Sequence, residues 1–299
     1  EVLLQERADE GGAGVVEDDD CPVDWKRLPL LEMARLGWIE AVGRVRDHAE
    51  EIGRSLVEAA GGLRAVPAPL CRRGDGPRPN AKADPHALFA WTLKVLAVAR
   101  SRPLPASYRP GTVTPDFLTD IARLSAREDG PCAAKEELGR HGIHLLFVPH
   151  LRRTYLDGAA LMVADTGSPV VALTLRHDRL DNFWFCLLHE LAHVGRHLRG
   201  LGDAFMDDMD LRDAPARNED PREQEADEAA EEALIPRAEW EASRLTRAPS
   251  YARVTAFAQR LGVHPAIVAG RIRHETKDFR KFAPLLGSGE VSRLLTYEK

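Results

Sequence analysis

The spacing of hydrophobic and polar positions divides this chain into a helical first part, a short strand-rich stretch and a second helical part. Apolar residues recur every three or four positions before residue 142 and again after residue 180, which predicts helices. Between these parts, apolar runs of strand length end at Pro149 or flank the turn sequence Thr166-Gly167-Ser168. The predicted helices cover 25–60, 86–100, 117–127, 131–141 and several segments after 180; the predicted strands are 143–149, 159–165 and 169–175.

These elements predict an α+β fold in which a small antiparallel sheet lies beside a helical majority. The first 22 residues are polar, with GGAG and EDDD runs, and are typical of a disordered tail or linker. The expected organisation is a disordered tail or linker at 1–22, a helical N-terminal segment at 23–60, a linker at 61–85, one domain at 86–285 and a C-terminal tail at 286–299.

The net charge of −6 gives no overall indication of nucleic-acid binding, although a modest basic surface outside the acidic stretch is compatible with it. Acidic residues are concentrated in residues 203–232, where 13 acids and 3 bases give a local charge of −10, so the rest of the chain nets +4. We expect the acidic stretch at 203–220 to be solvated, with gating of a site or repulsion of anionic partners as the alternatives.

The cysteines are widely separated and form no CxxC pair, which fits neither a zinc knuckle nor a disulfide framework. Reduced thiols in a cytoplasmic protein are the simpler interpretation. No apolar run approaches 18 residues and no signal peptide is visible, so no membrane association is expected. The chain opens on Glu1, and the natural protein is expected to extend further upstream. The four cysteines are Cys21, Cys71, Cys132 and Cys186.

The string FWFCLLHELAHVGRHL at residues 183–198 carries the main chemical signal. His189 and His193 are four residues apart on a predicted helix, so both imidazoles project from one face and can bind one ion at about 2.0–2.1 Å. Glu190 is adjacent to the first ligand and can reach a metal-activated water as a general base. The apolar run before His189 places the motif in the core, which argues against the alternative of surface histidines on an amphipathic helix.

A catalytic zinc site usually has three protein ligands, so a third ligand must come from elsewhere. A metzincin would require glycine at 196 and histidine at 199, but both positions are arginine. The helix predicted between Pro221 and Pro236 supplies Glu223 as the preferred ligand, with Glu225 as the alternative. A third interpretation is that Glu223 only completes a helix capping box with Asp220.

Two neighbouring residues have predicted roles beside the ligands. Asp227 lies one turn beyond Glu223 and is placed to accept the free N–H of a ligating histidine, which would fix its tautomer. His197 follows His193 by four residues, but three histidines on one straight helix cannot converge on one ion. We therefore expect His197 at the surface or at the edge of the pocket.

These residues resemble the ImmA/IrrE family of bacterial metallopeptidases, whose members combine a HExxH helix with a later E-x-x-A-N-x-x-A…LL-x-P helix. The corresponding positions of the second helix are Glu223, Ala226, Asp227, Ala230, Leu234, Ile235 and Pro236. The family's usual asparagine is Asp227 here, and its usual aromatic residue is Ala229. The resemblance implies a zincin-like domain in which His189, His193 and Glu223 hold Zn²⁺ and Glu190 activates water.

Four further strings resemble the HigA-like, antitoxin-associated branch of that family: TYLDGAA (154–160), LTLRHDRLDNFWF (173–185), VHPAIVAGRIRHE (263–275) and, more distantly, LEMARLGWI (31–39). Relatives in this branch often carry an N-terminal helix-turn-helix. None is evident here, so one expected route to DNA contact is such a segment upstream of Glu1.

Two other regions have candidate roles. Residues 254–275 superficially read as helix, glycine turn and helix, so a DNA-binding module is one hypothesis. The resemblance instead assigns the segment to the peptidase-like domain, where Arg271 or His264 would stabilise an oxyanion; Arg271 as a structural ion-pair partner is the alternative. Tyr155 and Asp157 are candidates for lining a substrate groove, with ordinary turn chemistry at Asp157-Gly158 as the other interpretation.

The expected function is a zinc-dependent endopeptidase that cuts a DNA-binding repressor or antitoxin-type protein in a stress or toxin–antitoxin circuit, because relatives of this family cut a repressor. An extended substrate is expected to pair with an exposed sheet edge, for which the strand beginning at Ala159 is a candidate. The alternative is an antitoxin-like transcriptional regulator in which the peptidase-like domain serves as a sensor or binding scaffold.

Overall fold

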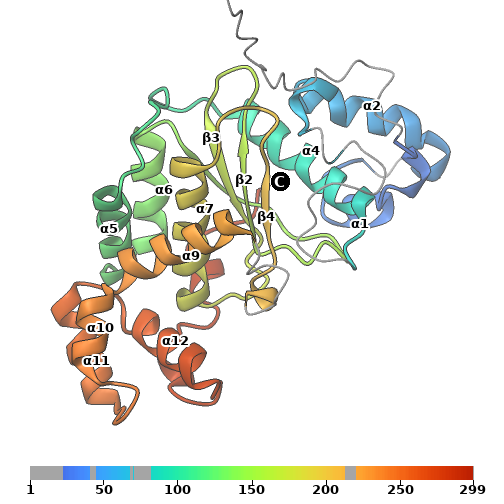
Figure 1. Cartoon of the computed structure of the whole chain (residues 1–299). Helices are drawn as coiled ribbons and strands as arrows, with labels where there is room; N and C mark the ends of the chain where they lie inside the picture. The colour runs from blue at the N-terminus through green and yellow to red at the C-terminus, as the bar shows by residue number, and fades with distance from the viewer. Residues whose placement is uncertain (1–22, 41–44, 68–69, 71–81, 213–219, 299) are drawn as a thin grey trace, which may run out of the picture.

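The computed structural model describes residues 23–40, 45–67, 70, 82–212 and 220–298. Its α+β architecture agrees with the expected fold class. A four-stranded sheet lies between two layers of helices (Figure 1). The predicted tail at 1–22 lies outside the described residues, as does most of the predicted linker.

The sheet has the order β1-β3-β2-β4. Strands β2 and β3 form the expected antiparallel pair around Gly167, and β4 pairs antiparallel with the other side of β2. The sheet is mixed rather than wholly antiparallel, because β1 runs parallel to β3. Every residue of β1 is buried, so its apolar run carries no alternation from which its direction could be inferred. The strands are β1 (His144–Phe147), β2 (Gly158–Met162), β3 (Pro169–Leu173) and β4 (Phe205–Asp207).

Each face of the sheet contributes to a different hydrophobic core. Along β1, Leu145 and Phe147 enter the core on the α7 side, whereas Leu146 packs into the core on the α4 side. The α7 side is covered by α5 (Pro115–Arg123), α6 (Gly130–Arg140), α7 (Leu180–Arg196) and α9 (Pro221–Leu234) (Figure 1).

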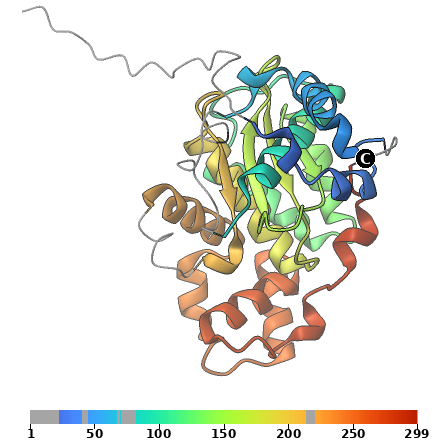
Figure 2. The same ribbon diagram turned by 90° about the vertical axis from the view of Figure 1, so that its right-hand side faces the viewer.

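The helices beyond α9 extend the α7-side core. Gly262 adopts a left-handed conformation and ends α11, after which Pro265 begins α12. Apolar residues of both helices are buried in the same core as α7. These helices lie at the end of the molecule opposite α2 (Figure 2). They are α10 (Arg237–Ser243), α11 (Tyr251–Leu261) and α12 (Pro265–Thr276).

The N-terminal segment is helical as expected, and it packs on α4 within the core on that side of the sheet. Met33 and Leu56 share one core with α4 and with Leu146 of the sheet. Asp84 caps α4 by accepting a hydrogen bond from the backbone N–H of His86. This segment is therefore continuous with the core on the α4 side. Its helices are α1 (Leu30–Arg35) and α2 (Ala49–Ala60), and they face α4 (Pro85–Ser101).

The C-terminal segment at 286–299 was expected to be a tail, but its described residues are packed. It contains α13 (Glu290–Leu294), with Val291 fully buried. The backbone N–H of Glu298 donates to the carbonyl of Phe147, and the Glu298 carboxylate pairs with Lys135. The segment is mostly polar, so the burial of its apolar residues Leu286, Val291 and Leu295 could not be predicted from its composition. Among the described residues, no helix combines the length and apolar content needed to cross a bilayer.

Candidate metal centre

Helix α7 places the HExxH residues in the core. Apolar residues on the same helix, including Phe183 and Leu191, are buried against the sheet and α9. His189, Glu190 and His193 are each 0% exposed. The Nε2 atoms of His189 and His193 lie 3.0 Å apart, so both imidazoles point at one position, as the four-residue spacing predicts.

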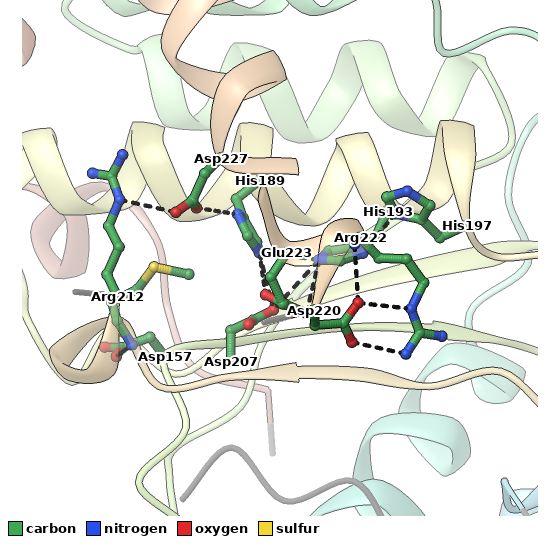
Figure 3. Close-up of polar contacts among 11 residues, drawn as sticks. Asp157, His189, His193, His197, Asp207, Arg212, Asp220, Arg222, Glu223 and Asp227 are labelled. Atoms are coloured by element: carbon green, nitrogen blue, oxygen red, sulfur yellow. Dashed lines mark hydrogen bonds and ion pairs between the residues drawn. The ribbon is translucent and has the colours of Figure 1, made fainter. Parts of the chain in front are cut away.

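Helix α9 brings Glu223 to the same position. Its carboxylate oxygens lie 3.4 Å from Nε2 of His189 and 3.5 Å from Nε2 of His193. Ala226 and Ala230 are fully buried, and their small side chains allow α9 to approach α7 closely. Asp220 caps α9 through the N–H of Arg222, while the Glu223 side chain turns to the histidines, so the capping-box interpretation does not describe its carboxylate (Figure 3).

Asp207, at the end of β4, is a fourth member of the cluster that the sequence did not indicate. Its Oδ2 lies 3.2 Å from Nε2 of His189 and 3.9 Å from Nε2 of His193. One ligand atom each from His189, His193, Asp207 and Glu223 lies within 4.8 Å of the others. In the sequence Asp207 belongs to an acidic stretch expected to be solvated. The adjacent apolar residues Phe205 and Met206 are the local sign of a buried strand there.

The second ring nitrogen of each histidine is also held. Asp227 Oδ1 lies 2.8 Å from Nδ1 of His189, which is the position that the sequence predicted for it. Nδ1 of His193 lies 3.0 Å from Nδ1 of His197, and Nε2 of His197 lies 3.1 Å from the Glu225 carboxylate. Glu225, the alternative ligand, thus pairs with His197 and not with the cluster. His197 lies against the His193 ring and orients it (Figure 3). Such contacts fix tautomer and ring orientation in metal sites.

Glu190 lies beside the cluster without joining the set of four. Neither of its carboxyl oxygens receives a hydrogen bond from a donor among the residues that the structure describes. Burial, and then the nearby charge of Asp207, hold the pKa of Glu190 well above its ordinary value. Gly158 makes room for it, because a Cβ at that position would lie 2.3 Å from Glu190 Oε1. The turn residue Gly158 therefore has a packing role that its Asp-Gly sequence did not suggest.

The electrostatics of the cluster suit a bound cation. Burial lowers the pKa of His193, whereas at His189 the carboxylates of Asp207, Asp227 and Glu223 outweigh burial and raise its pKa well above the usual range. The two histidines hold the pKa of Glu223 below its ordinary value despite its burial. Several carboxylates buried together require positive charge. Two imidazoles and two carboxylates at this spacing fit Zn²⁺, which coordinates nitrogen and oxygen ligands tetrahedrally.

Arg271 and His264 lie outside the cluster. The Arg271 guanidinium donates to the Ile235 carbonyl at 3.0 Å and to Glu275 at 3.1 Å, and it stacks over Trp240. His264 caps α12 by accepting a hydrogen bond from Ala266 N. The structure does not bring either residue to the metal centre; these contacts are those of the structural ion-pair partner that was the alternative for Arg271.

The segment at 254–275 forms two helices joined at Gly262, as the sequence predicted. The second of them, α12, is packed into the domain, with Ala266, Val268 and Ile272 fully buried and in contact with the core around α7. A recognition helix must present its N-terminal side chains to a DNA groove. The burial of α12 therefore favours its assignment to the peptidase-like domain.

Two arginines adjoin the centre, and the sequence gave neither a role. Arg212 donates to Asp227 at 3.1 Å, also pairs with Glu231, and lies 3.9 Å from the Phe185 ring centroid. Arg176 lies 2.7 Å from carboxylate oxygens of both Asp157 and Asp208. Phe185 and Arg212 also line part of a cavity of about 500 Å³, together with residues of α12, but the four residues of the cluster are not in its lining.

The fold and this centre together define a metallopeptidase-like α+β domain. Residues 139–273 match the family model for the IrrE N-terminal-like domain, Peptidase_M78. The matched segment is a little under half of the chain, and it contains the four strands, α7, α9 and most of α12. This match supports the resemblance to the ImmA/IrrE family. No curated protein and no solved structure matches the chain significantly.

Proposed function

We propose that this chain is a zinc-dependent endopeptidase that acts on a transcriptional repressor or antitoxin-type protein. The observation that carries the proposal is that α7 presents two candidate metal ligands and, separately, a buried carboxyl group that could act as a general base. His189 and His193 converge with Glu223 on one position, while the buried Glu190 stands next to it and outside the donor set. A purely structural ion needs no general base, so this arrangement favours catalysis.

When bound, zinc would polarise the scissile carbonyl and activate a water as nucleophile at neutral pH. His189, His193 and Glu223 would hold it, and Asp227 and His197 would orient the two imidazoles. Glu190 would take the proton of the attacking water on a carboxyl oxygen and return it to the leaving amide nitrogen. Burial, and then the nearby charge of Asp207, raise the pKa of Glu190, which makes its carboxylate a stronger base toward the water proton.

The substrate class rests on the family resemblance, whose members include enzymes that cut repressors. The structure changes one detail of how a substrate would bind. The strand beginning at Ala159 was a candidate edge, but β2 lies inside the sheet, between β3 and β4. Gly158, Ala159 and Ala160 are all paired with β4. A peptide can add to β2 at these residues only if β4 leaves.

A regulatory role without catalysis is the second candidate function, and one observation favours it. Asp207 supplies a fourth buried carboxylate or imidazole donor, and four protein ligands are typical of structural rather than catalytic zinc. In that case the domain would act as a metal-dependent sensor or binding scaffold in an antitoxin-like transcriptional regulator.

The experiment that separates these functions compares protein termini in cells. The wild-type protein, Glu190→Gln and, as a matched control, Glu225→Gln would be expressed at equal levels under stress, and new protein N-termini would be identified by mass spectrometry. We expect new termini within a DNA-binding regulator for the wild type and Glu225→Gln, and their loss for Glu190→Gln. Identical termini in all three strains would reject the peptidase and favour the scaffold.

A further inference from the structure

We infer that β4 is a built-in occupant of the peptide-binding edge of this domain and that Asp207 closes the metal centre in the resting protein. The inference rests on the proposed peptidase function and adds its regulation. It also identifies the ligand of that edge as an extended peptide segment that replaces Phe205–Asp207 along β2.

β2 begins beside Glu190, the proposed general base of α7. Gly158 begins β2 and lies directly against the Glu190 carboxyl, since a Cβ there would meet Glu190 Oε1 and also lie 3.0 Å from its Cγ. In register, Gly158 pairs with Asp207. A chain that runs antiparallel along this part of β2 therefore passes over Glu190 and the metal position, as a scissile peptide must.

Two side chains of β4 contact the histidines of the metal centre. Successive residues of a strand face opposite sides, so Phe205 and Asp207 face α7 while Met206 packs into the other core. The Phe205 ring stacks on His193 at a centroid distance of 4.2 Å. Asp207 reaches His189 at 3.2 Å. β4 thus covers the centre as a bound peptide would, with a carboxylate facing the metal position.

β4 also limits the access of water and substrate to the metal position. A catalytic zinc site keeps one position open for water or substrate. Here His189 and His193 are 0% exposed and Asp207 is 3% exposed. With Asp207 in place, the donor set has four members, and the peptide edge of β2 at 158–160 is already paired. Both the metal position and the main-chain partners of a substrate are occupied by the same three-residue strand.

β4 is held by its pairing with β2 and by polar contacts next to that ladder. The ladder is short, so contacts at its end contribute much of the attachment. Asp157 accepts a hydrogen bond from Met209 N at 2.9 Å, and Asp157 N donates to the Asp207 carbonyl at 2.8 Å. Arg176 lies 2.7 Å from both Asp157 and Asp208 and 3.1 Å from Asp210. Arg176 therefore joins the start of β2 to the residues that follow β4, and it works as a latch.

Exchange of one strand for another opens such a site at low cost, because a substrate strand restores the main-chain hydrogen bonds that β4 gives up. What is lost is the ion pairs of Arg176 with Asp208 and Asp210 and the approach of Asp207 to the metal position. A partner protein that offers an extended segment with an acidic side chain for Arg176 would replace these as well.

The first experiment tests Asp207 through the metal itself. Metal-free wild type, Asp207→Asn and the loop control Asp203→Asn would be titrated with Co²⁺, and visible spectra and Zn²⁺ affinity against a chromogenic chelator would be recorded. Asp203 accepts hydrogen bonds from Arg199 N and Gly200 N, away from the centre. We expect an altered Co²⁺ spectrum and about tenfold weaker Zn²⁺ binding for Asp207→Asn only. Identical spectra and affinities for all three proteins would overturn the inference.

The second experiment tests the latch without changing a metal contact. Hydrogen exchange at the amides of Asp157 and Met209 would be compared in the wild type, Arg176→Gln and the neighbouring control Arg179→Gln, which pairs with Asp181. We expect about tenfold faster exchange in Arg176→Gln alone. Unchanged exchange would contradict the latch.

Failure of the inference and failure of the proposed function give different results. If Asp207→Asn changes the Co²⁺ spectrum while Glu190→Gln changes no protein terminus, the closing role of Asp207 stands and the peptidase is rejected. If Glu190-dependent cleavage occurs while Asp207→Asn has no effect on metal binding, the peptidase stands and the occupancy of the edge by β4 is rejected.

Discussion

Asp227 approaches His189 from the side opposite the metal position, with 2.8 Å between Asp227 Oδ1 and Nδ1 of the imidazole. The contact crosses from α9 to α7 and leaves Nε2 of His189 directed at Glu223 and Asp207. It is a carboxylate–histidine pair of the kind that surrounds zinc sites, and it places the ligand-bearing faces of the two helices in register. Arg212 holds the other oxygen of Asp227 at 3.1 Å, which orients the carboxylate.

This pair gives the first prediction. Asp227→Ala should weaken Zn²⁺ binding by about 10- to 100-fold, because the His189 ring loses the acceptor that fixes its tautomer and orientation. Competition with a chelator measures the change. Glu228→Ala, at the exposed next position of α9, is the control and should bind Zn²⁺ like the wild type. Equal affinities for the two variants would mean that Asp227 does not support the metal site.

Gly158 gives the second prediction, which concerns packing around the general base. In Gly158→Ala the new methyl group would lie 2.3 Å from Glu190 Oε1, and the buried carboxyl has to move. We expect a loss of about 1–3 kcal/mol in the free energy of unfolding, as for other overpacked sites. Denaturant unfolding measures it. Gly139→Ala in α6 is the control, since its methyl group meets only Leu104 Cδ2 at 3.9 Å and should not destabilise the protein.

His144 gives a prediction for pH. It is 5% exposed in β1, and burial lowers its pKa to about 4. The unfolded chain takes up this proton near pH 6.5, whereas the folded protein resists it until about pH 4. The contribution of neutral His144 to stability is therefore complete above pH 6.5 and is lost as the pH falls toward 4. His144→Leu should flatten the decline of the unfolding free energy across that window. A pH series of denaturant titrations with the same slope for both proteins would contradict this.

The α7 part of the site could be predicted because all its information is local. His189, Glu190 and His193 lie within one turn and a half of helix, and the apolar run before them indicates a buried face. Glu223 could be found because prolines mark the ends of its helix and small residues mark its close face. In each case helical spacing alone determines which side chains lie together.

Asp207 and Arg176 could not be found in this way, because their positions depend on strand pairing between distant segments. Asp207 reaches the centre only when β4 pairs with β2 in one register, and a shift by one residue would turn it to the opposite core. The parallel direction of β1 likewise depends on the path of the chain across the sheet. Arg271 is held by Ile235 and Glu275 through the packing of α12, which no local pattern specified.

The proposed function depends on one zinc ion held by His189, His193 and Glu223, and the metal content of the purified protein shows whether that ion is bound. Purified wild type, Glu223→Gln and the matched variant Glu225→Gln would be exposed to Zn²⁺, dialysed and analysed by mass spectrometry for zinc per chain. Glu225 contacts His197 instead of the cluster, and a glutamine there keeps a carbonyl acceptor. We predict about one zinc per chain in the wild type and Glu225→Gln, and loss or clear weakening in Glu223→Gln. A wild type that holds no zinc, or equal loss in both variants, would contradict the account.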